Sequence, residues 1–216
     1  MTPERFQKIK DILNKRQPDL TVVLDNVHKP HNLAAIIRSC DAVGICDIHA
    51  ISSHEQKVGV NLKSAGGSNH WVNLHIHHSV LKVISDLKQS GFSIYAANGS
   101  EKAVDYRKVD YTKPTAIVLG AELDGISKET LYRVDGKIKI PMQGMVENLN
   151  VSVANAVILF EAQRQRLQAG LYEKCRLDKN TVEKLLFEFS YPEAAKVYQS
   201  KGEDYPKLDT EGQIIF

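Results

Sequence analysis

Short apolar runs and amphipathic segments alternate along most of this chain, and this alternation restricts the fold more than any other feature of the sequence. The apolar runs have the length of strands, and glycine or polar residues separate them from helical patterns. This order predicts an α/β fold with a mostly parallel sheet and helices on both faces. We expect strands at 21–24, 47–51, 71–76, 93–97, 115–119 and 137–140, and helices at 32–43, 79–90, after Ser127 and at 151–168.

The two ends of the chain depart from this pattern. Residues 1–18 hold a short basic helix with one apolar face, and residues 171–216 hold two amphipathic helices followed by a loose tail. We therefore expect three parts: a basic helical extension at 1–18, a central domain at 19–170, and a C-terminal helical extension at 171–216. The length of 216 residues suits one main domain with such appendages.

The composition is that of an ordinary globular protein, with 43% hydrophobic and 25% charged residues. No apolar run is long enough to span a membrane, and residues 1–16 do not resemble a signal peptide, so we expect a cytoplasmic protein with no membrane partner. The three cysteines lack metal-ligand spacing, which favours reduced, mostly buried thiols over a disulfide framework or a zinc site.

Eight histidines raise the question of a metal site, because His75, His77 and His78 lie close together. Neither an acidic residue nor a cysteine accompanies them in the sequence, and they alternate along a predicted strand. We interpret them as a partly exposed strand edge and expect no metal. His28 and His31 flank a turn at Lys29-Pro30, where they suit either contact with RNA or local hydrogen bonding.

Periodicity does not explain the polar segment 141–150, which joins a predicted strand to a predicted helix. The helix begins with small residues that allow close packing, and its first half is apolar on nearly every side, which favours burial at a subunit interface. A crevice between a strand end and a helix is where α/β proteins bind ligands.

Two earlier segments also place polar residues or glycines beside a predicted strand or helix. Gly120, Glu122 and Gly125 follow an apolar strand, where glycine permits a tight turn and a close approach to a ligand. The lysine of a phosphate-binding loop is missing, as is the glycine pattern of a dinucleotide-binding fold. Upstream, Asn32 is placed to cap a helix that carries Arg38 away from its apolar stripe. The loop at 63–69 is rich in small polar residues, which suits either closure over a substrate or a simple long connection.

These three segments, at 26–41, 119–127 and 140–156, resemble the three motifs of the SPOUT methyltransferases in order. The resemblance extends over essentially the whole chain and is greatest to the bacterial TrmH branch. It implies a deep C-terminal trefoil knot, S-adenosyl-L-methionine as cofactor, and methyl transfer to the ribose 2'-hydroxyl of a guanosine in the tRNA D-loop. It also implies a homodimer packed through the helix at 151–168.

The resemblance assigns roles to particular residues. It places an activating arginine at Arg38, with Asn32, Glu122 and Asn150 orienting the site. Because a guanidinium stays protonated at neutral pH, we expect Arg38 to hold phosphate and stabilise the developing alkoxide while water takes the proton. The resemblance places the cofactor against Ala97, Asn98, Gly120, Ile140 and Leu149. We expect phosphate contacts from Lys8, Lys15, Arg16, His31, Arg164, Arg166 and Lys174.

One position departs from the family. The third motif usually reads Ser-Leu-Asn, whereas this chain has Asn148-Leu149-Asn150. The longer side chain of Asn148 can crowd the ribose or change its hydrogen bonds. Two alternatives to a D-loop tRNA enzyme stay open: a ribose methyltransferase for ribosomal RNA or another tRNA position, and a non-catalytic RNA-binding dimer of the same fold.

Overall fold

The computed structural model describes residues 1–51, 71–121 and 124–215. The predicted loop at 63–69 and the predicted site residue Glu122 lie outside this range. The chain divides into two compact units. The central unit spans Pro18–Ala169, and the terminal unit joins Met1–Gln17 to Gly170–Phe216. The two ends, expected as separate extensions, thus belong to one unit.

The central unit is built on a seven-stranded sheet in the order β3-β2-β1-β6-β4-β7-β5, and each pairing in it is parallel. This confirms the α/β fold with a parallel sheet. The prediction missed β5, which is only two residues long and has no detectable periodicity. The strands are β1 Leu20–Asp25, β2 Asp47–Ile51, β3 Asn73–His77, β4 Ser93–Ala97, β5 Val104–Asp105, β6 Thr115–Gly120 and β7 Gly136–Lys139.

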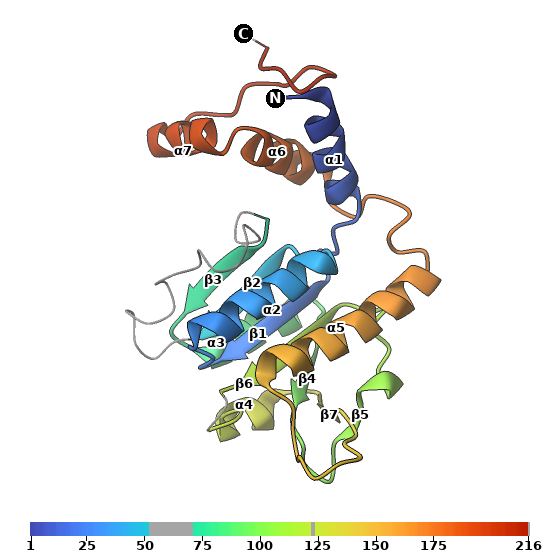
Figure 1. Ribbon diagram of the computed structural model, residues 1–216. Helices are drawn as coiled ribbons and strands as arrows, with labels where there is room; N and C mark the ends of the chain where they lie inside the picture. Colours follow the sequence, from blue (N-terminus) through green and yellow to red (C-terminus); the bar gives the residue numbers. More distant parts are fainter. Residues whose placement is uncertain (52–70, 122–123, 216) are drawn as a thin grey trace. The chain divides into compact units, whose positions relative to one another are not determined.

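Helices cover both faces of the sheet (Figure 1). Helices α2 (Pro30–Ala42) and α5 (Val151–Gln168) pack on one face, and α3 (Val80–Gln89) and α4 (Lys128–Arg133) pack on the other. Strand β1 shows how the sequence builds two cores, because side chains alternate between faces. Its Val22 and Leu24 join the core under α2 and α5, whereas Val23 joins the core under α3. The trefoil knot stays a prediction.

The start of α2 differs from the sequence prediction. Asn32 does not cap this helix, because α2 begins two residues earlier at Pro30, and Lys29 is its N-cap without a side-chain hydrogen bond. Proline suits the first turn because its ring fixes φ and because a first-turn N–H needs no helical partner. Asn32 therefore lies inside the helix, where it is buried. The predicted helix at 151–168 matches α5 at both ends.

The terminal unit contains α1 (Pro3–Asn14), α6 (Lys179–Ser190) and α7 (Pro192–Lys201), with α1 packed on α6. The expected loose tail is instead folded against this unit. The Tyr191 hydroxyl donates to the Gly212 carbonyl at 2.8 Å, and Leu208 pairs with Ile214. A side chain at Gly212 would meet the Phe6 ring at 2.5 Å. The prediction of a loose tail was wrong because these contacts join residues far apart in the sequence.

The cysteines are free, with Cys40 and Cys46 buried and Cys175 exposed. Burial raises the pKa of the Cys40 thiol, so it stays protonated in the core. Across the described ranges, no helix is both long and apolar enough to cross a membrane.

Candidate active site

A cavity of about 490 Å³ lies at the carboxyl ends of β4, β6 and β7 in the central unit. This edge is where parallel sheets bind ligands. The loop between β7 and α5 forms another wall, and the first two turns of α5 close it. Ala97, Asn98, Gly120, Ile140 and Leu149, the residues predicted to contact a cofactor, all line the cavity.

Gly120 lies where β6 meets the cavity, and its lack of a side chain shapes this wall. A Cβ atom at this position would lie 2.2 Å from the carbonyl carbon of Gly125 and 2.4 Å from the backbone nitrogen of Ile126. The chain turns back on itself here, with Ala121 bridged to Gly125 and Gly125 at a φ of 66°. The backbone of this loop can therefore line the cavity directly, as Gly120, Ala121, Gly125 and Ile126 do.

The buried carboxylate of Asp25 ties this loop to the sheet. Asp25 ends β1 beside Gly120, and its Oδ2 accepts hydrogen bonds from the Ser127 amide at 3.0 Å and the Thr130 hydroxyl at 2.9 Å. Its backbone carbonyl accepts from the Ala121 amide at 3.1 Å. The carboxylate is thus held by neutral donors at the base of the cavity loop. Sequence reasoning missed Asp25, because the two donors from the cavity loop and α4 lie 102 and 105 positions along the chain.

The predicted site residues Asn32 and Asn150 come together across 118 residues of sequence. The Asn150 Nδ2 donates to Asn32 Oδ1 at 3.2 Å, and the Asn150 Oδ1 caps α5 by accepting from the Ser152 amide at 2.8 Å. Asn150 lines the cavity, whereas Asn32 is buried behind it. The pair therefore joins the start of α2 to the start of α5 beside the cavity.

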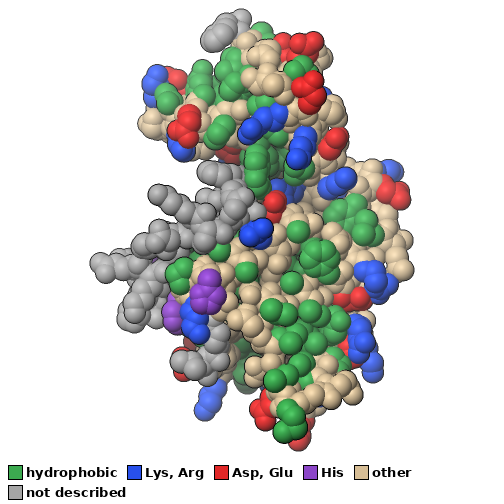
Figure 2. Space-filling model, in the orientation of Figure 1, with side chains coloured by type: hydrophobic (Ala, Val, Ile, Leu, Met, Phe, Trp, Pro, Cys, Tyr) green, Lys and Arg blue, Asp and Glu red, His purple; other side chains and the backbone are tan. Residues whose placement is uncertain are grey.

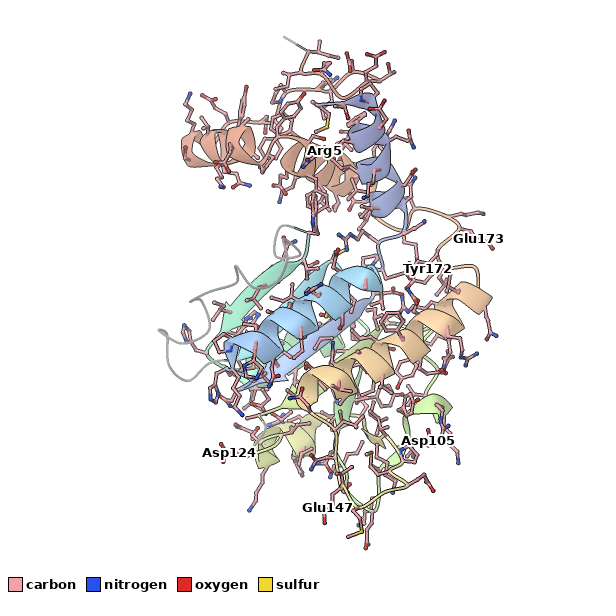
Figure 3. All side chains as sticks on the ribbon, viewed as in Figure 1. Arg5, Asp105, Asp124, Glu147, Tyr172 and Glu173 are labelled. Carbon is pink, nitrogen blue, oxygen red and sulfur yellow. The ribbon has the colours of Figure 1, made fainter. Side chains whose placement is uncertain are left out.

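Charged residues also line the cavity. Lys29, Lys139 and Glu147 line it, together with Asn148, the residue that departs from the family pattern. Glu147 lies on the loop between β7 and α5 (Figure 3). A cavity lined by two lysines and one glutamate suits a ligand with both a carboxylate and a cationic group. The sequence prediction did not include these three charged residues, because no motif marked them.

Arg38 does not lie in this cavity. It is exposed on α2 and is not among the lining residues. Within the ranges that the structure describes, its guanidinium makes no hydrogen bond or ion pair. Leaning toward the helix N-terminus does not bring Arg38 to Asn32, because the two residues lie on different faces of α2, one exposed and one buried. Arg38 is therefore available to a group that approaches from outside its own chain.

The residues predicted to contact RNA fall into two groups. Lys8, Lys15, His31, Arg164 and Lys174 are exposed, although Arg164 also pairs with Glu161 at 2.7 Å. Arg16 and Arg166 are buried, with exposed fractions of 1% and 0%.

The prediction of a phosphate contact is therefore wrong for these two residues. The Arg166 guanidinium forms its hydrogen bonds within the central unit. It donates to the Asp19 carboxylate at 2.6 Å and to the Tyr111 and Lys113 carbonyls at 2.8 and 3.1 Å. Arg166 thus links α5 to the residue before β1 and to the loop before β6.

Comparison with known proteins agrees with this architecture. Residues 19–160 match the SpoU rRNA methylase family, and residues 164–216 match the C-terminal part described for SpoU rRNA methylases. The chain belongs to the SpoU methylase family. Its fold and the order of its three motifs are those expected from the SPOUT resemblance.

Two curated relatives of this SpoU methylase are matched over nearly their whole length. The tRNA (guanosine(18)-2'-O)-methyltransferase of Thermus thermophilus is 54% identical over 86% of this chain and 95% of its own. The enzyme of the same name from Escherichia coli is 46% identical over 99% of this chain and 94% of its own.

Solved structures lead to the same family. The TrmH/SpoU tRNA modifying enzyme of A. aeolicus superposes with a TM-score of 0.82 at 41% identity, covering 88% of this chain and 96% of its own. The SpoU methyltransferase AviRb from Streptomyces viridochromogenes, in complex with the cofactor AdoMet, has a TM-score of 0.61 at 26% identity, covering 72% and 62%. A relative of this SpoU methylase thus binds AdoMet on the same fold.

Proposed function

We propose that this protein is a tRNA (guanosine(18)-2'-O)-methyltransferase, which transfers a methyl group from S-adenosyl-L-methionine to the ribose 2'-hydroxyl of the D-loop guanosine. The observation that carries the proposal is the cavity at the ends of β4, β6 and β7, lined by the five residues predicted to hold the cofactor. Relatives named for this reaction, 54% and 46% identical, support the choice of substrate. Because tRNA is the proposed substrate, we expect the protein in the cytoplasm.

The residues of the cavity fit S-adenosyl-L-methionine. Ala97, Gly120 and Ile140 offer backbone donors and acceptors at strand ends, which suit the edge of an adenine. The close turn at Gly120 leaves that backbone uncovered. Lys29, Lys139 and Glu147 carry charges that complement the carboxylate and ammonium groups of an amino-acid tail. When bound, the cofactor would supply a methyl carbon activated by the sulfonium group.

The remaining task is to align the ribose hydroxyl with that carbon and to remove its proton. We propose that Arg38 holds an RNA phosphate and stabilises negative charge on the 2'-oxygen as the new C–O bond forms and the C–S bond breaks. The proton leaves to water, because a guanidinium is already protonated. Asn32 and Asn150 fix the starts of the two helices that flank this region. Glu122, which lies outside the described residues, keeps its proposed orienting role.

We propose that Arg38 acts in the cavity of a second copy within a homodimer. Helix α5 carries apolar side chains that its own chain leaves uncovered: Val153 is 47% exposed, Phe160 48% and Leu167 56%. Their spacing along the helix places them on one stripe. Hydrophobic side chains gather over this part of the surface in Figure 2. Because α2 packs beside α5, a dimer through α5 would bring Arg38 close to the partner. Sedimentation of the protein as a monomer at micromolar concentration would contradict this arrangement.

Asp25 is predicted to be a positioning residue for the cofactor loop. Replacing Asp25 with alanine removes the acceptor of the Ser127 amide, the Thr130 hydroxyl and the Asn26 side-chain amide, so three donors lose this partner. We expect S-adenosyl-L-methionine to bind about tenfold more weakly, since unpaired buried donors cost about 1–3 kcal/mol. Isothermal titration calorimetry of the variant measures this loss. Thr130→Val, which removes one donor only, should have a smaller effect, and equal affinity in wild type and Asp25→Ala would contradict the assignment.

The exposed lysines of the terminal unit are predicted to contact tRNA phosphates. Changing Lys8, Lys15 and Lys174 to alanine together should weaken tRNA binding and reduce its dependence on salt. The slope of log K against log salt should fall by about 2–3, because each phosphate contact contributes about 0.7–0.9. Filter binding across a salt series measures both quantities.

A control variant with the same loss of charge replaces Lys82, Lys88 and Lys196, each of which already pairs with a carboxylate. It should bind tRNA nearly as the wild type does. An identical loss in both variants would show that net charge, and not position, governs binding.

Substrate choice between RNA classes is tested by competition. The purified protein receives labelled S-adenosyl-L-methionine with an equimolar mixture of unmodified tRNA and ribosomal RNA, and the two RNAs are then separated. We expect label in the tRNA. Label mainly in ribosomal RNA would favour the alternative of an rRNA methylase, as the family description suggests.

A further inference from the structure

The turn that follows β1 is held in a backbone conformation that most residues avoid. Asn26 has a φ of 59°, and in the part of the chain that the structure describes it is the one residue other than glycine with a positive φ. Asparagine tolerates this left-handed conformation better than most residues, but the conformation still costs free energy. The Asn26 side chain donates to the Asp25 carboxylate at 3.0 Å, and its backbone N–H donates to the Ile51 carbonyl at 3.3 Å. These two hydrogen bonds hold the turn in place.

The carbonyl group of Asn26 fixes the ring of His28. The carbonyl oxygen lies 2.9 Å from His28 Nδ1. Because a carbonyl oxygen can only accept, Nδ1 carries the proton in this hydrogen bond. In the neutral ring, Nε2 is then the nitrogen without a proton, and it can accept one. His28 is exposed, and across the described residues its ring makes no hydrogen bond except the one at Nδ1.

This basic nitrogen belongs to a loop at the rim of the cofactor cavity. Lys29, the residue that follows His28, lines the cavity. At the other end of the loop, the Asp25 carbonyl accepts from the amide of Ala121, which also lines the cavity, at 3.1 Å. The sequence left two uses open for His28, contact with RNA or local hydrogen bonding. The local bond occupies Nδ1 and leaves Nε2 to face a bound molecule.

The proposed function leaves one proton without a final acceptor. The ribose 2'-hydroxyl must lose its proton, and a guanidinium cannot take it. We propose that His28 Nε2 accepts this proton through one water molecule, at the cavity of its own chain. The inference rests on the proposed function and adds to it the group that receives the proton from water.

Bonds and charges balance in this step. As the ribose oxygen bonds to the methyl carbon, the C–S bond breaks and its electron pair stays on sulfur. The hydroxyl proton passes to the water, the water gives a proton to Nε2, and the ring becomes an imidazolium ion. The Asn26 carbonyl stabilises this cation by accepting from its Nδ1–H. Because His28 is exposed, the ring then returns the proton to solvent.

The first test examines the ring in the free protein, without cofactor or tRNA. It uses ¹⁵N NMR of the labelled wild type at about pH 8, where an ordinary histidine is neutral. His28 should carry its proton on Nδ1 and none on Nε2, and the spectrum of His28→Gln identifies its signals. A proton on Nε2 in the wild type would overturn the proposal.

The second test measures methyl transfer to tRNA by His28→Ala in single turnovers, with saturating tRNA and cofactor. The rate should fall by about a hundredfold or more, which is the contribution typical of a positioned base. Added imidazole should restore part of the rate in proportion to its concentration, because it replaces the lost ring. Calorimetry with S-adenosyl-L-methionine and filter binding of tRNA should give the affinities of the wild type.

His78→Ala is the matched control, because His78 is exposed and follows the edge strand β3, outside the turn. It should keep the wild-type rate with and without imidazole. Circular dichroism verifies that each variant is folded, and the NMR test on the wild type remains informative if His28→Ala is not. A wild-type rate in His28→Ala, or a loss that imidazole does not restore, would overturn the proposal. If the wild type itself transferred no methyl group to tRNA, the proposed function would fail instead.

Discussion

Changing Arg38 to alanine should lower kcat for tRNA methylation by about a thousandfold. This is the loss expected when a group that stabilises a developing oxyanion is removed. Arg38→Lys should recover only part of the activity, because lysine keeps the charge and loses the two-pronged contact with phosphate. Single-turnover rates with saturating tRNA and cofactor measure the chemical step.

Binding measurements separate this loss from damage to the cavity. Arg38 does not line the cavity, so Arg38→Ala should bind S-adenosyl-L-methionine as tightly as the wild type. Arg133→Ala, which removes another exposed arginine of the central unit, should keep full turnover. Wild-type turnover by Arg38→Ala would contradict any catalytic role for this residue.

A mixed dimer shows which subunit supplies Arg38. One subunit carries Arg38→Ala, and the other carries Gly120→Ala, which is expected to destroy its cofactor cavity. If Arg38 acts on the partner, the intact cavity receives an arginine from the other subunit, and the mixed dimer regains about half of the wild-type activity. If Arg38 acts within its own chain, neither subunit is complete and the mixed dimer stays inactive.

Gly120→Ala should weaken S-adenosyl-L-methionine binding by at least about a hundredfold, or about 2.7 kcal/mol. The added Cβ would lie 2.2 to 2.4 Å from backbone atoms of Gly125 and Ile126, which is closer than any van der Waals contact. Flexible side chains can move away from such a clash, but here the backbone that lines the cavity must move. Calorimetry with the cofactor measures the loss.

Gly144→Ala provides the matched control. Gly144 lies on the loop between β7 and α5, and a Cβ there would meet no atom within 4 Å. This variant should bind the cofactor nearly as the wild type does. Normal cofactor affinity in Gly120→Ala would mean that the loop at 120–126 does not hold the cofactor.

The sequence predicted the helices and strands that depend on residues close together in the chain. Helix α5 matched at both ends, and Asn150 caps its first turn. The cavity residues were predicted from the resemblance to the SPOUT methyltransferases, and they lie together because parallel strands end at one edge of the sheet. The start of α2 was missed by two residues, because Asn32 is a good capping residue that the structure uses instead to bond Asn150.

Features that depend on distant partners were not predictable from one sequence. Arg166 resembles any basic residue of an amphipathic helix, yet Asp19, Tyr111 and Lys113 surround it in the folded chain. In the sequence, Asp25 is only the polar residue at the end of a predicted strand. Its hydrogen bond with Thr130 forms only when α4 packs over it in the folded chain. His49 and His77 lie on different strands, and their rings form a hydrogen bond only because β2 and β3 pair in register.

The most direct test of the proposed function compares two tRNA transcripts that differ by one oxygen. One carries guanosine at position 18 of the D-loop, and the other carries 2'-deoxyguanosine there. With tritium-labelled S-adenosyl-L-methionine, we expect label on the first and none on the second. Equal labelling of both would contradict ribose methylation at this nucleotide, and no label on either would favour a non-catalytic RNA-binding dimer.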